Sequence, residues 1–357
     1  MKVELTPVLK KAHTFYSRRP GRRCTCGSTM VMSFIAMRSR YSLPVVRQCV
    51  MASFAFDNEL TLTGPFRAPR QMLADQEYDG HTSVHDDATA DKLGLPGAPI
   101  EGPTHFSQFD PLGVAMWGSA WFEHGCISSH FENMVIEGEE VQATATRTSV
   151  TSARIGAVKS DGNSVLSGTM TRGPNHSETE LDRRLGSLKD PGELFIIDQL
   201  RVGDKSKPER VSMSFTESNG HLYPFSLNDK LKMITEPSPW YASDTAAQSP
   251  WGRAVIPTEM VSVLAHKVGG VGKVRGPAVG LFIDLEVRLI NGPLFVGAEY
   301  ELVHEIVGMG QSRRVESYWT RTSITDPASG VLVATVLLHQ GVFKASYDKY
   351  PADKLAP

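Results

Sequence analysis

The sequence predicts an α+β protein built from two tandem copies of one unit, in which a buried helix precedes antiparallel strands. Apolar residues recur at helical spacing between residues 106 and 121, and short runs with the alternation of β-strands follow. The pattern then returns: Ile100 and Gly138 have counterparts in Ile256 and Gly297, at offsets of 256 − 100 = 156 and 297 − 138 = 159 residues. Two nearly equal offsets indicate an internal duplication.

Composition and charge limit the classes of function. The 357 residues are 41% apolar, which is enough for a sizeable core, and the net charge is -2. The first 50 residues carry ten Lys and Arg against one acidic residue, or +9, so the remainder carries -2 - 9 = -11. An acidic body gives no support to nucleic-acid binding, and no apolar run approaches the roughly 20 residues of a membrane span.

The basic segment 1–52 is set apart from the body. It is either a mitochondrial transit peptide, because it is Arg-rich and poor in acids, or a disordered or mis-called extension upstream of Met51, and we exclude it from the fold. Cys24 and Cys26 have no further ligand pair nearby, so no metal site is predicted. Cys126 is the single cysteine of the body, which argues against a disulfide framework and for a reducing, cytoplasmic location.

The first copy is expected to span residues 53–174. It opens with a strand and loop at 54–72 and a short helix at 86–93, where two acidic residues suit the first turn and a glycine follows the end. Pro111 should interrupt or kink the long helix that comes next, and other structure should enclose this helix because it is apolar on most sides. Strands are expected at 127–136, 141–150, 154–158 and 165–172, with a turn at 161–163.

A polar segment at 175–208 is expected to link the copies, because it is charged and poor in apolar residues. The second copy should span 209–350 and contain a helix at 260–268. Its strands are expected at 281–290, 316–325 and 331–343, with a turn at 326–330.

Three short motifs occur in an order that resembles a known family. They are Val84-His85-Asp86-Asp87, Pro99-Ile100-Glu101-Gly102 and Val135-Ile136-Glu137-Gly138-Glu139-Glu140-Val141. Their order and the duplication resemble the double-hotdog members of the MaoC-like dehydratases, relatives of the (R)-specific enoyl-CoA hydratases. The resemblance implies two tandem hotdog domains, each an antiparallel sheet wrapped around a long helix. It also implies an acyl-CoA or acyl-carrier thioester substrate, with no cofactor.

The same resemblance implies the site. In that family an Asp-x-Asn-Pro-x-His loop holds a water, and its Asp and His act as base and acid on a 2-enoyl thioester. The His position falls on His85, whereas the Asp position holds Gly80. Asp79 is one place too early and His81 one place late, so either is a candidate helper. The Asn and Pro positions hold Thr82 and Ser83.

The second copy is expected to lack this pair of residues. At the same spacing it has Glu236, Ser238, Pro239 and Tyr241, so Tyr replaces His and Glu replaces Asp. One site per chain is therefore expected, served mainly by the first copy.

The chemistry suits the residues of the first copy. Histidine can exchange protons near neutral pH, and a helix N-terminus can stabilise the negative charge that develops on a thioester oxygen. Gly102 would open that helix, and because Pro103 has no N–H, the expected donors are Gly102 and Thr104. Substrate contacts are expected from Ile100, Glu101, Thr104, His105, Phe106 and Trp117.

Each candidate also has a structural interpretation. His85 could be a surface-loop or capping histidine, Asp79 a turn residue, and His105 a hydrogen-bonded core histidine. Cys126 has no partner base at a recognisable spacing, so it is expected to be buried at the start of a strand. The large aromatic residues of the helix are expected in the core, with some lining an acyl tunnel: Phe106, Phe109, Trp117 and Trp121.

Two other functions remain open. A thioesterase is one, because the same fold hosts such enzymes, and Glu101 would be its carboxylate. A non-catalytic acyl-thioester binder is the other, because the Asp-x-Asn-Pro-x-His pattern is broken. A homodimer is a further partner to consider, although a duplicated chain can already supply the pairing that single hotdogs achieve by dimerising.

Overall fold

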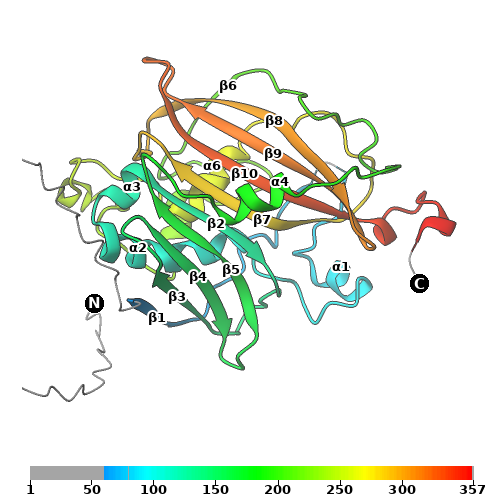
Figure 1. Cartoon of the computed structure of the whole chain (residues 1–357), viewed down its shortest axis with the longest axis horizontal. Coiled ribbons are helices and arrows are strands. Elements are labelled where there is room, and N and C mark those ends of the chain that lie inside the picture. The colour runs from blue at the N-terminus through cyan, green and yellow to red at the C-terminus, as the bar shows by residue number, and fades with distance from the viewer. Residues whose placement is uncertain (1–59, 79, 356–357) are drawn as a thin grey trace, which may run out of the picture. The chain divides into compact units, whose positions relative to one another are not determined.

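A computed structural model describes residues 60–78 and 80–355, and their strands form one antiparallel sheet of ten (Figure 1). The strands of the first copy are β1 (Thr61–Arg67), β2 (Gly125–Phe131), β3 (Val141–Arg147), β4 (Ser152–Lys159) and β5 (Ser164–Arg172). Those of the second copy are β6 (Glu209–Ser212), β7 (Gly280–Leu289), β8 (Glu299–Gln311), β9 (Val315–Thr325) and β10 (Leu332–Phe343). Asp79 and the basic segment 1–52, with Cys24 and Cys26, lie outside the described residues.

The strand order confirms the duplication. It is β1-β3-β4-β5-β2-β7-β10-β9-β8-β6, so the second half repeats the first in reverse, with each strand number raised by five. The halves join where β2 pairs with β7. Isolated bridges Pro99↔Ile136 and Val255↔Phe295 are also equivalent, at 255 − 99 = 156 and 295 − 136 = 159 residues, the offsets seen in the sequence. The domain limits at 174 and 208 remain a prediction.

The helices of the body are short. In the first copy they are α1 (Asp87–Lys92), the 3-10 helix η1 (Gly102–Phe109), α2 (Asp110–Trp117) and α3 (Ala120–His124). In the linker and the second copy they are α4 (Glu180–Gly186), α5 (Leu227–Met233) and α6 (Thr258–Ala265), with three 3-10 turns, η2 (Ala246–Gln248), η3 (Lys344–Ser346) and η4 (Ala352–Lys354). The short helix expected at 86–93 is thus confirmed as α1.

The helical run after Gly102, which Pro111 was expected to interrupt or kink, is not one continuous helix. The run is divided into η1, α2 and α3, and Gly118, with φ of 62°, ends α2. Pro111 lies in the first turn of α2, where its missing N–H costs nothing, so it starts a helix instead of kinking one.

The core lies between the sheet and the helices η1 and α6. Phe106, Phe109 and Trp121 are fully buried there, as expected, and Leu285 of β7 belongs to the same core cluster. Trp117 is an exception, because it is only half-buried and its indole N–H donates to the carbonyl oxygen of Val150. Cys126 is buried at the start of β2, which confirms its structural interpretation.

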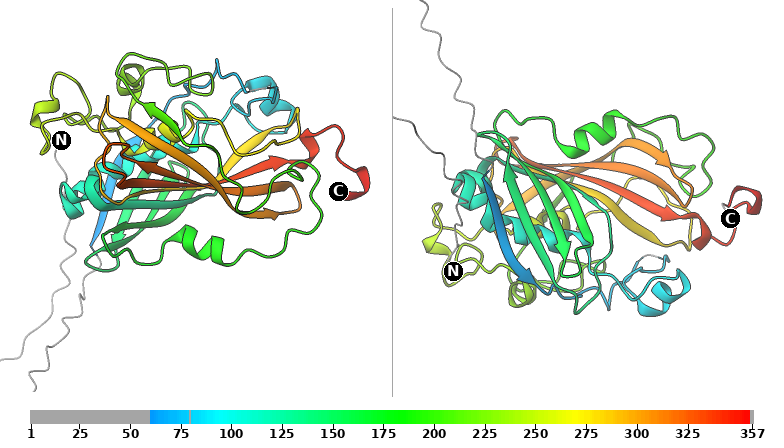
Figure 2. Two further views of the ribbon diagram at one scale, coloured as in Figure 1. Left: turned by 90° about the horizontal axis from the view of Figure 1, so that it is seen from above. Right: turned by 60° about the horizontal axis from the view of Figure 1, so that its bottom comes forward.

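The linker is not a free connection, because α4 forms within it and covers the outer face of the sheet, opposite to α6 (Figure 2). A capping box starts the helix: the Thr179 hydroxyl accepts from Asp182 N, and the Asp182 carboxylate accepts from Thr179 N. Leu181 is its one fully buried residue and packs against Trp319 and Leu337. Leu185, one turn later, packs against the same cluster. Two apolar residues in a charged stretch are too few to mark a helix, which is why the sequence indicated only a linker.

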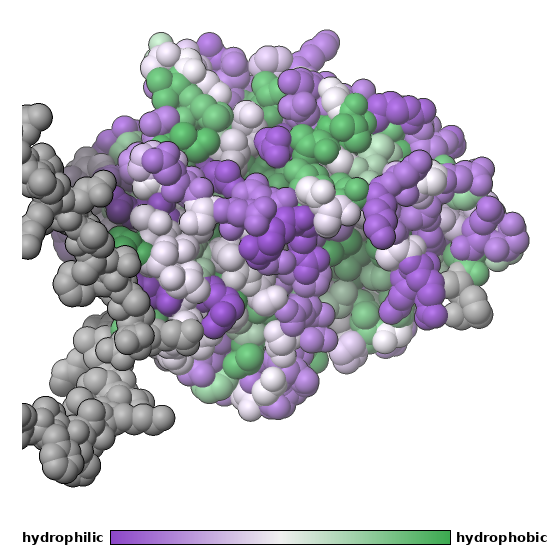
Figure 3. Space-filling view, viewed as in Figure 1, coloured by the Kyte–Doolittle hydropathy of each residue, from purple (hydrophilic) through white to green (hydrophobic). Residues whose placement is uncertain are grey.

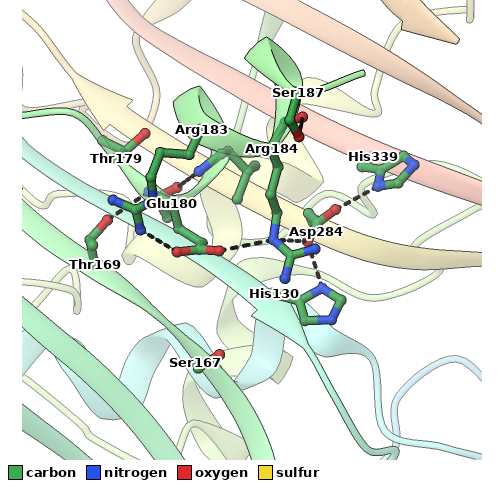
Figure 4. A network of polar contacts seen from close by, with 12 residues as sticks. His130, Ser167, Thr169, Thr179, Glu180, Arg183, Arg184, Ser187, Asp284 and His339 are labelled. Atoms are coloured by element: carbon green, nitrogen blue, oxygen red, sulfur yellow. Dashed lines mark hydrogen bonds and ion pairs between the residues drawn. The ribbon is translucent and has the colours of Figure 1, made fainter. Parts of the chain in front are cut away.

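A buried carboxylate holds α4 on the sheet (Figure 4). Asp284 of β7 accepts from Nδ1 of His130 at 2.7 Å and from Nδ1 of His339 at 2.5 Å, and Nε of Arg184 lies 3.6 Å away. Burial raises the pKa of Asp284, but the two histidine hydrogen bonds outweigh burial and hold it below its usual value. The His339 ring also stacks on Trp319, with centroids 4.2 Å apart.

The outer face carries both hydrophilic and apolar patches (Figure 3). Hydrophilic side chains lie over α4 at the centre of the face shown in Figure 3. Within residues 60–78 and 80–355, no helix has the length and apolar character that crossing a membrane requires.

Candidate active site

Residues of both copies line one cavity of about 180 Å³. His85, Gly102 and His105 line it from the first copy. Its walls in the second copy include Tyr223, His266, Phe282 and Gln340. The cavity is therefore a property of the paired units, since neither copy supplies all of its lining.

His85 is placed by the loop before α1. The Asp86 carboxylate caps α1 by accepting from Thr89 N at 2.8 Å, which fixes the backbone next to the histidine. Nδ1 of His85 lies 2.7 Å from the carbonyl oxygen of Pro99, and because a carbonyl only accepts, Nδ1 carries the proton. Nε2 is then free to accept a proton. Burial lowers the pKa of His85 below 6.5, so the neutral form prevails at pH 7.

Gly102 is the first residue of η1, at the edge of the cavity. A Cβ at this position would lie 2.7 Å from Cζ of Phe131, so the close approach of the ring requires glycine. Its N–H belongs to the first turn, where backbone donors lack intrahelical partners. Thr104 is not available as the second expected donor, because its N–H donates to the carbonyl oxygen of Glu101 at 3.1 Å.

Within the described residues, the structure places neither of the two expected helper residues, Asp79 and His81, in the cavity with His85. Asp79 is not among the described residues, so its role remains a prediction. His81 lines an adjoining cavity instead, with its Nδ1 3.3 Å from the carbonyl oxygen of Ala278. His266 and Gln340 line both cavities and mark the boundary between them.

His105 differs from the hydrogen-bonded core histidine that its position in a buried helix suggested. It is 2% exposed and lines the cavity, yet its Nδ1 has no hydrogen-bond partner in the described residues. Burial, followed by the charges of Lys230 and Lys159, lowers the pKa of His105 to about 4. It is therefore a neutral imidazole with an unused polar atom beside the cavity.

Glu101 belongs to a buried charge cluster that joins the copies. Nζ of Lys230 in α5 lies 3.3 Å from Oε1 of Glu101, 3.7 Å from Oε1 of Glu259 in α6 and 3.0 Å from Oγ1 of Thr104. Burial raises the pKa of Glu259 to about 7, against the opposing charge of Lys230. Burial lowers the pKa of Lys230, but the two carboxylates outweigh it and the net pKa is raised. No local sequence pattern predicts this cluster.

The residues expected to contact substrate divide into two groups. Ile100, Glu101 and His105 line the cavity. Thr104, Phe106 and Trp117 do not line it: Thr104 is bonded to Lys230, Phe106 is a core residue beside Phe131, and Trp117 lies near the surface.

The equivalent place in the second copy is filled. Counting 156 residues on from His85 and Gly102 leads to Tyr241 and Thr258, because 85 + 156 = 241 and 102 + 156 = 258. Oδ2 of Asp110 accepts from the Tyr241 hydroxyl at 2.9 Å and from Thr258 N at 3.2 Å. A carboxylate thus occupies the helix N-terminus that stands open in the first copy. The absence of a catalytic dyad from the second copy remains a prediction.

Comparison with known proteins identifies the fold. No protein-family model and no curated protein sequence matches the chain. RV0216, a conserved Mycobacterium tuberculosis protein with a double hotdog fold, matches with a TM-score of 0.50 at 10% identity, over 80% of this chain and 96% of its own. A MaoC domain protein dehydratase from Chloroflexus aurantiacus J-10-fl matches with a TM-score of 0.48 at 13% identity, over 81% of this chain and 95% of its own.

A further match is the dehydratase domain of PpsC from Mycobacterium tuberculosis, whose structure was solved in complex with C12:1-CoA. Its TM-score is 0.41 at 9% identity, over 79% of this chain and 94% of that domain. At 10% identity the match to RV0216 establishes the fold alone. The chain is a double-hotdog protein, as the sequence predicts, and solved structures of MaoC-like dehydratases are among those it resembles.

Proposed function

We propose that this protein is a hydratase or dehydratase that acts on a 2-enoyl or 3-hydroxyacyl thioester, carried by CoA or by a carrier protein. The supporting observation is that His85 and Gly102 line the same cavity, with Nδ1 of His85 tied to a backbone carbonyl. A tied Nδ1 leaves Nε2 as the ring atom through which His85 can take up or release a proton near neutral pH.

The cavity offers what hydration requires. His85 Nε2 can exchange a proton with a water or with the α-carbon of the acyl chain. The N–H of Gly102, at the positive end of η1, can stabilise the enolate charge on the thioester oxygen. Ile100, Leu281 and Phe282 supply apolar walls for the acyl chain.

The test is hydration of crotonyl-CoA, followed by the loss of its enoyl absorbance. His85→Asn should lower kcat at least about 100-fold, which is the low end for removal of a general acid–base group. His124→Asn is a matched control, because Nδ1 of His124 also bonds a backbone carbonyl at 2.7 Å, that of Ile290, and His124 does not line the cavity. Activity of His85→Asn equal to that of the control would rule out the assigned role.

A thioesterase is the second candidate, and one observation favours it. Glu101 lines the cavity, is 4% exposed, and its Oε2 has no hydrogen-bond partner in the described residues. Released CoA, measured with a thiol-trapping reagent, would support hydrolysis if Glu101→Gln abolished it. No activity in either assay, together with thermal stabilisation by the thioester, would support a binding protein instead.

A further inference from the structure

Two helices of equal length are related by the internal duplication. η1 (Gly102–Phe109) and α6 (Thr258–Ala265) each span eight residues and begin 258 − 102 = 156 positions apart. The same offset relates the residues that directly follow them, Asp110 and His266, because 266 − 110 = 156. The two helices pack against each other.

At the filled site of the second copy, the residue that follows one duplicated helix contacts the N-terminus of the other. Asp110 follows η1 and reaches the N-terminus of the other helix, where it bonds Thr258 and Tyr241, the counterparts of Gly102 and His85. By the same internal symmetry, the residue after α6 should face Gly102 and His85. His266 is that residue, and all three line one cavity.

His266 is held in the manner of His85. Its Nδ1 lies 2.7 Å from the carbonyl oxygen of Ser262, so Nδ1 carries the proton and Nε2 can accept one. The ring stacks on Phe282, with centroids 5.5 Å apart and planes within 20°. Burial lowers the pKa of His266, as it does that of His85. None of the hydrogen bonds among the described residues joins the two imidazoles, and the cavity lies between them.

We propose that His266 is the second proton-transfer residue of this site, in the role that the family loop gives to a carboxylate. The inference rests on the proposed function. Nε2 of His266 takes a proton from water as the water oxygen bonds to the β-carbon, and the π electrons move to the thioester oxygen at Gly102. The His85 imidazolium then gives its proton to the α-carbon as the carbonyl re-forms. The pair must hold one proton before the step, and that proton passes from His85 to His266 overall.

The kinetic test compares His266→Asn with the control His124→Asn in crotonyl-CoA hydration. His266→Asn should lower kcat at least about 100-fold, with KM changed far less. Wild type should show a bell-shaped pH profile from a pair that shares one proton, and His266→Asn should lose one limb. Added imidazole should restore part of the activity of His266→Ala. A kcat within tenfold of the control, or a profile with both limbs intact, would overturn the proposal.

A second measurement does not depend on turnover. Two imidazoles facing one cavity oppose each other's protonation, so the pKa of His85, followed by NMR, should rise in His266→Asn. It should stay at the wild-type value in His124→Asn. If wild type does not hydrate crotonyl-CoA, the proposed function fails while this measurement still tests the pairing. An unchanged His85 titration would overturn the pairing itself.

Discussion

Gly102→Ala tests whether the backbone must pass close to the cavity wall. The added Cβ would lie 2.7 Å from Cζ and 2.8 Å from Cε2 of Phe131, whereas ordinary contact begins at 3.4 Å. The ring must therefore retreat by 3.4 − 2.7 = 0.7 Å. Phe106 lies against that ring at 6.3 Å between centroids and is fully buried, so it resists movement on its side.

The expected cost follows from this geometry. Overpacking typically destabilises by about 1–3 kcal/mol, and because Phe131 is only half-buried we expect about 1 kcal/mol. The effect on activity should be larger. Phe131 lines the cavity beside the Gly102 amide, and a misplacement of this size can lower the rate about 100-fold.

Urea unfolding and crotonyl-CoA hydration would measure the two effects. Gly97→Ala, in the bend before η1, is the matched control, because its Cβ would meet Ile136 at 3.6 Å, an ordinary contact. Phe131→Leu in the Gly102→Ala background should recover part of the lost stability. If Gly102→Ala equals Gly97→Ala in both assays, or if Phe131→Leu restores nothing, the steric argument is refuted.

Three further predictions concern the buried charges. His105 has a pKa of about 4 in the folded protein, so it binds a proton more readily in the unfolded chain. The free energy of unfolding should therefore fall as pH drops from 6.5 towards 4, by up to about 3 kcal/mol. In urea unfolding, His105→Phe should lose less stability at acidic pH than wild type, and an equal loss would contradict the burial argument. Glu259 should give the opposite pH dependence of stability. Its pKa of about 7 in the folded protein means that the native state holds the proton between pH 4.5 and 7, so the free energy of unfolding should fall as pH rises through that range. Glu259→Gln should weaken this pH dependence, and an unchanged dependence would exclude Glu259 as its source. Lys230→Met should cost about 3–5 kcal/mol, because two buried carboxylates lose their cation, and adding Glu101→Gln should recover part of it; a loss below 1 kcal/mol in thermal or urea unfolding would show that the cluster is hydrated.

Much of the sheet could be predicted because its strands alternate. β3, for example, buries every second residue from Val141, and the expected range 141–150 found it. β8 carries the same alternation from Tyr300 but was missed, since the buried series includes the polar His304. α5 was missed although Ser226 and Asp229 form a capping box at its start. Short helices that bury two residues leave too little periodicity to see.

The site was predictable only where the motif is local. His85, Pro99 and Gly102 lie within 18 positions of one another, and the cavity unites them. Lys230 contacts Glu101 across 129 positions, and no local pattern marks such a pair. His266 carried one unused sign: it stands 156 residues after Asp110, the offset already fixed by Ile100 and Ile256.

The two copies differ in what lies at the N-terminus of the duplicated helix. In the second copy the carboxylate of Asp110 accepts from Thr258 N, Tyr241 and Trp121, so the positive end of α6 is already satisfied by a fixed negative charge. Burial raises the pKa of Asp110, and these hydrogen bonds oppose that rise. In the first copy the equivalent residue is His266, so no carboxylate takes the place of Asp110 at the end of η1, and the neighbouring Glu101 carboxylate is paired with Lys230. The N-terminus of η1 could therefore stabilise a negative charge that develops on a bound thioester. The N-terminus of α6 could not, because Asp110 would repel a second anion.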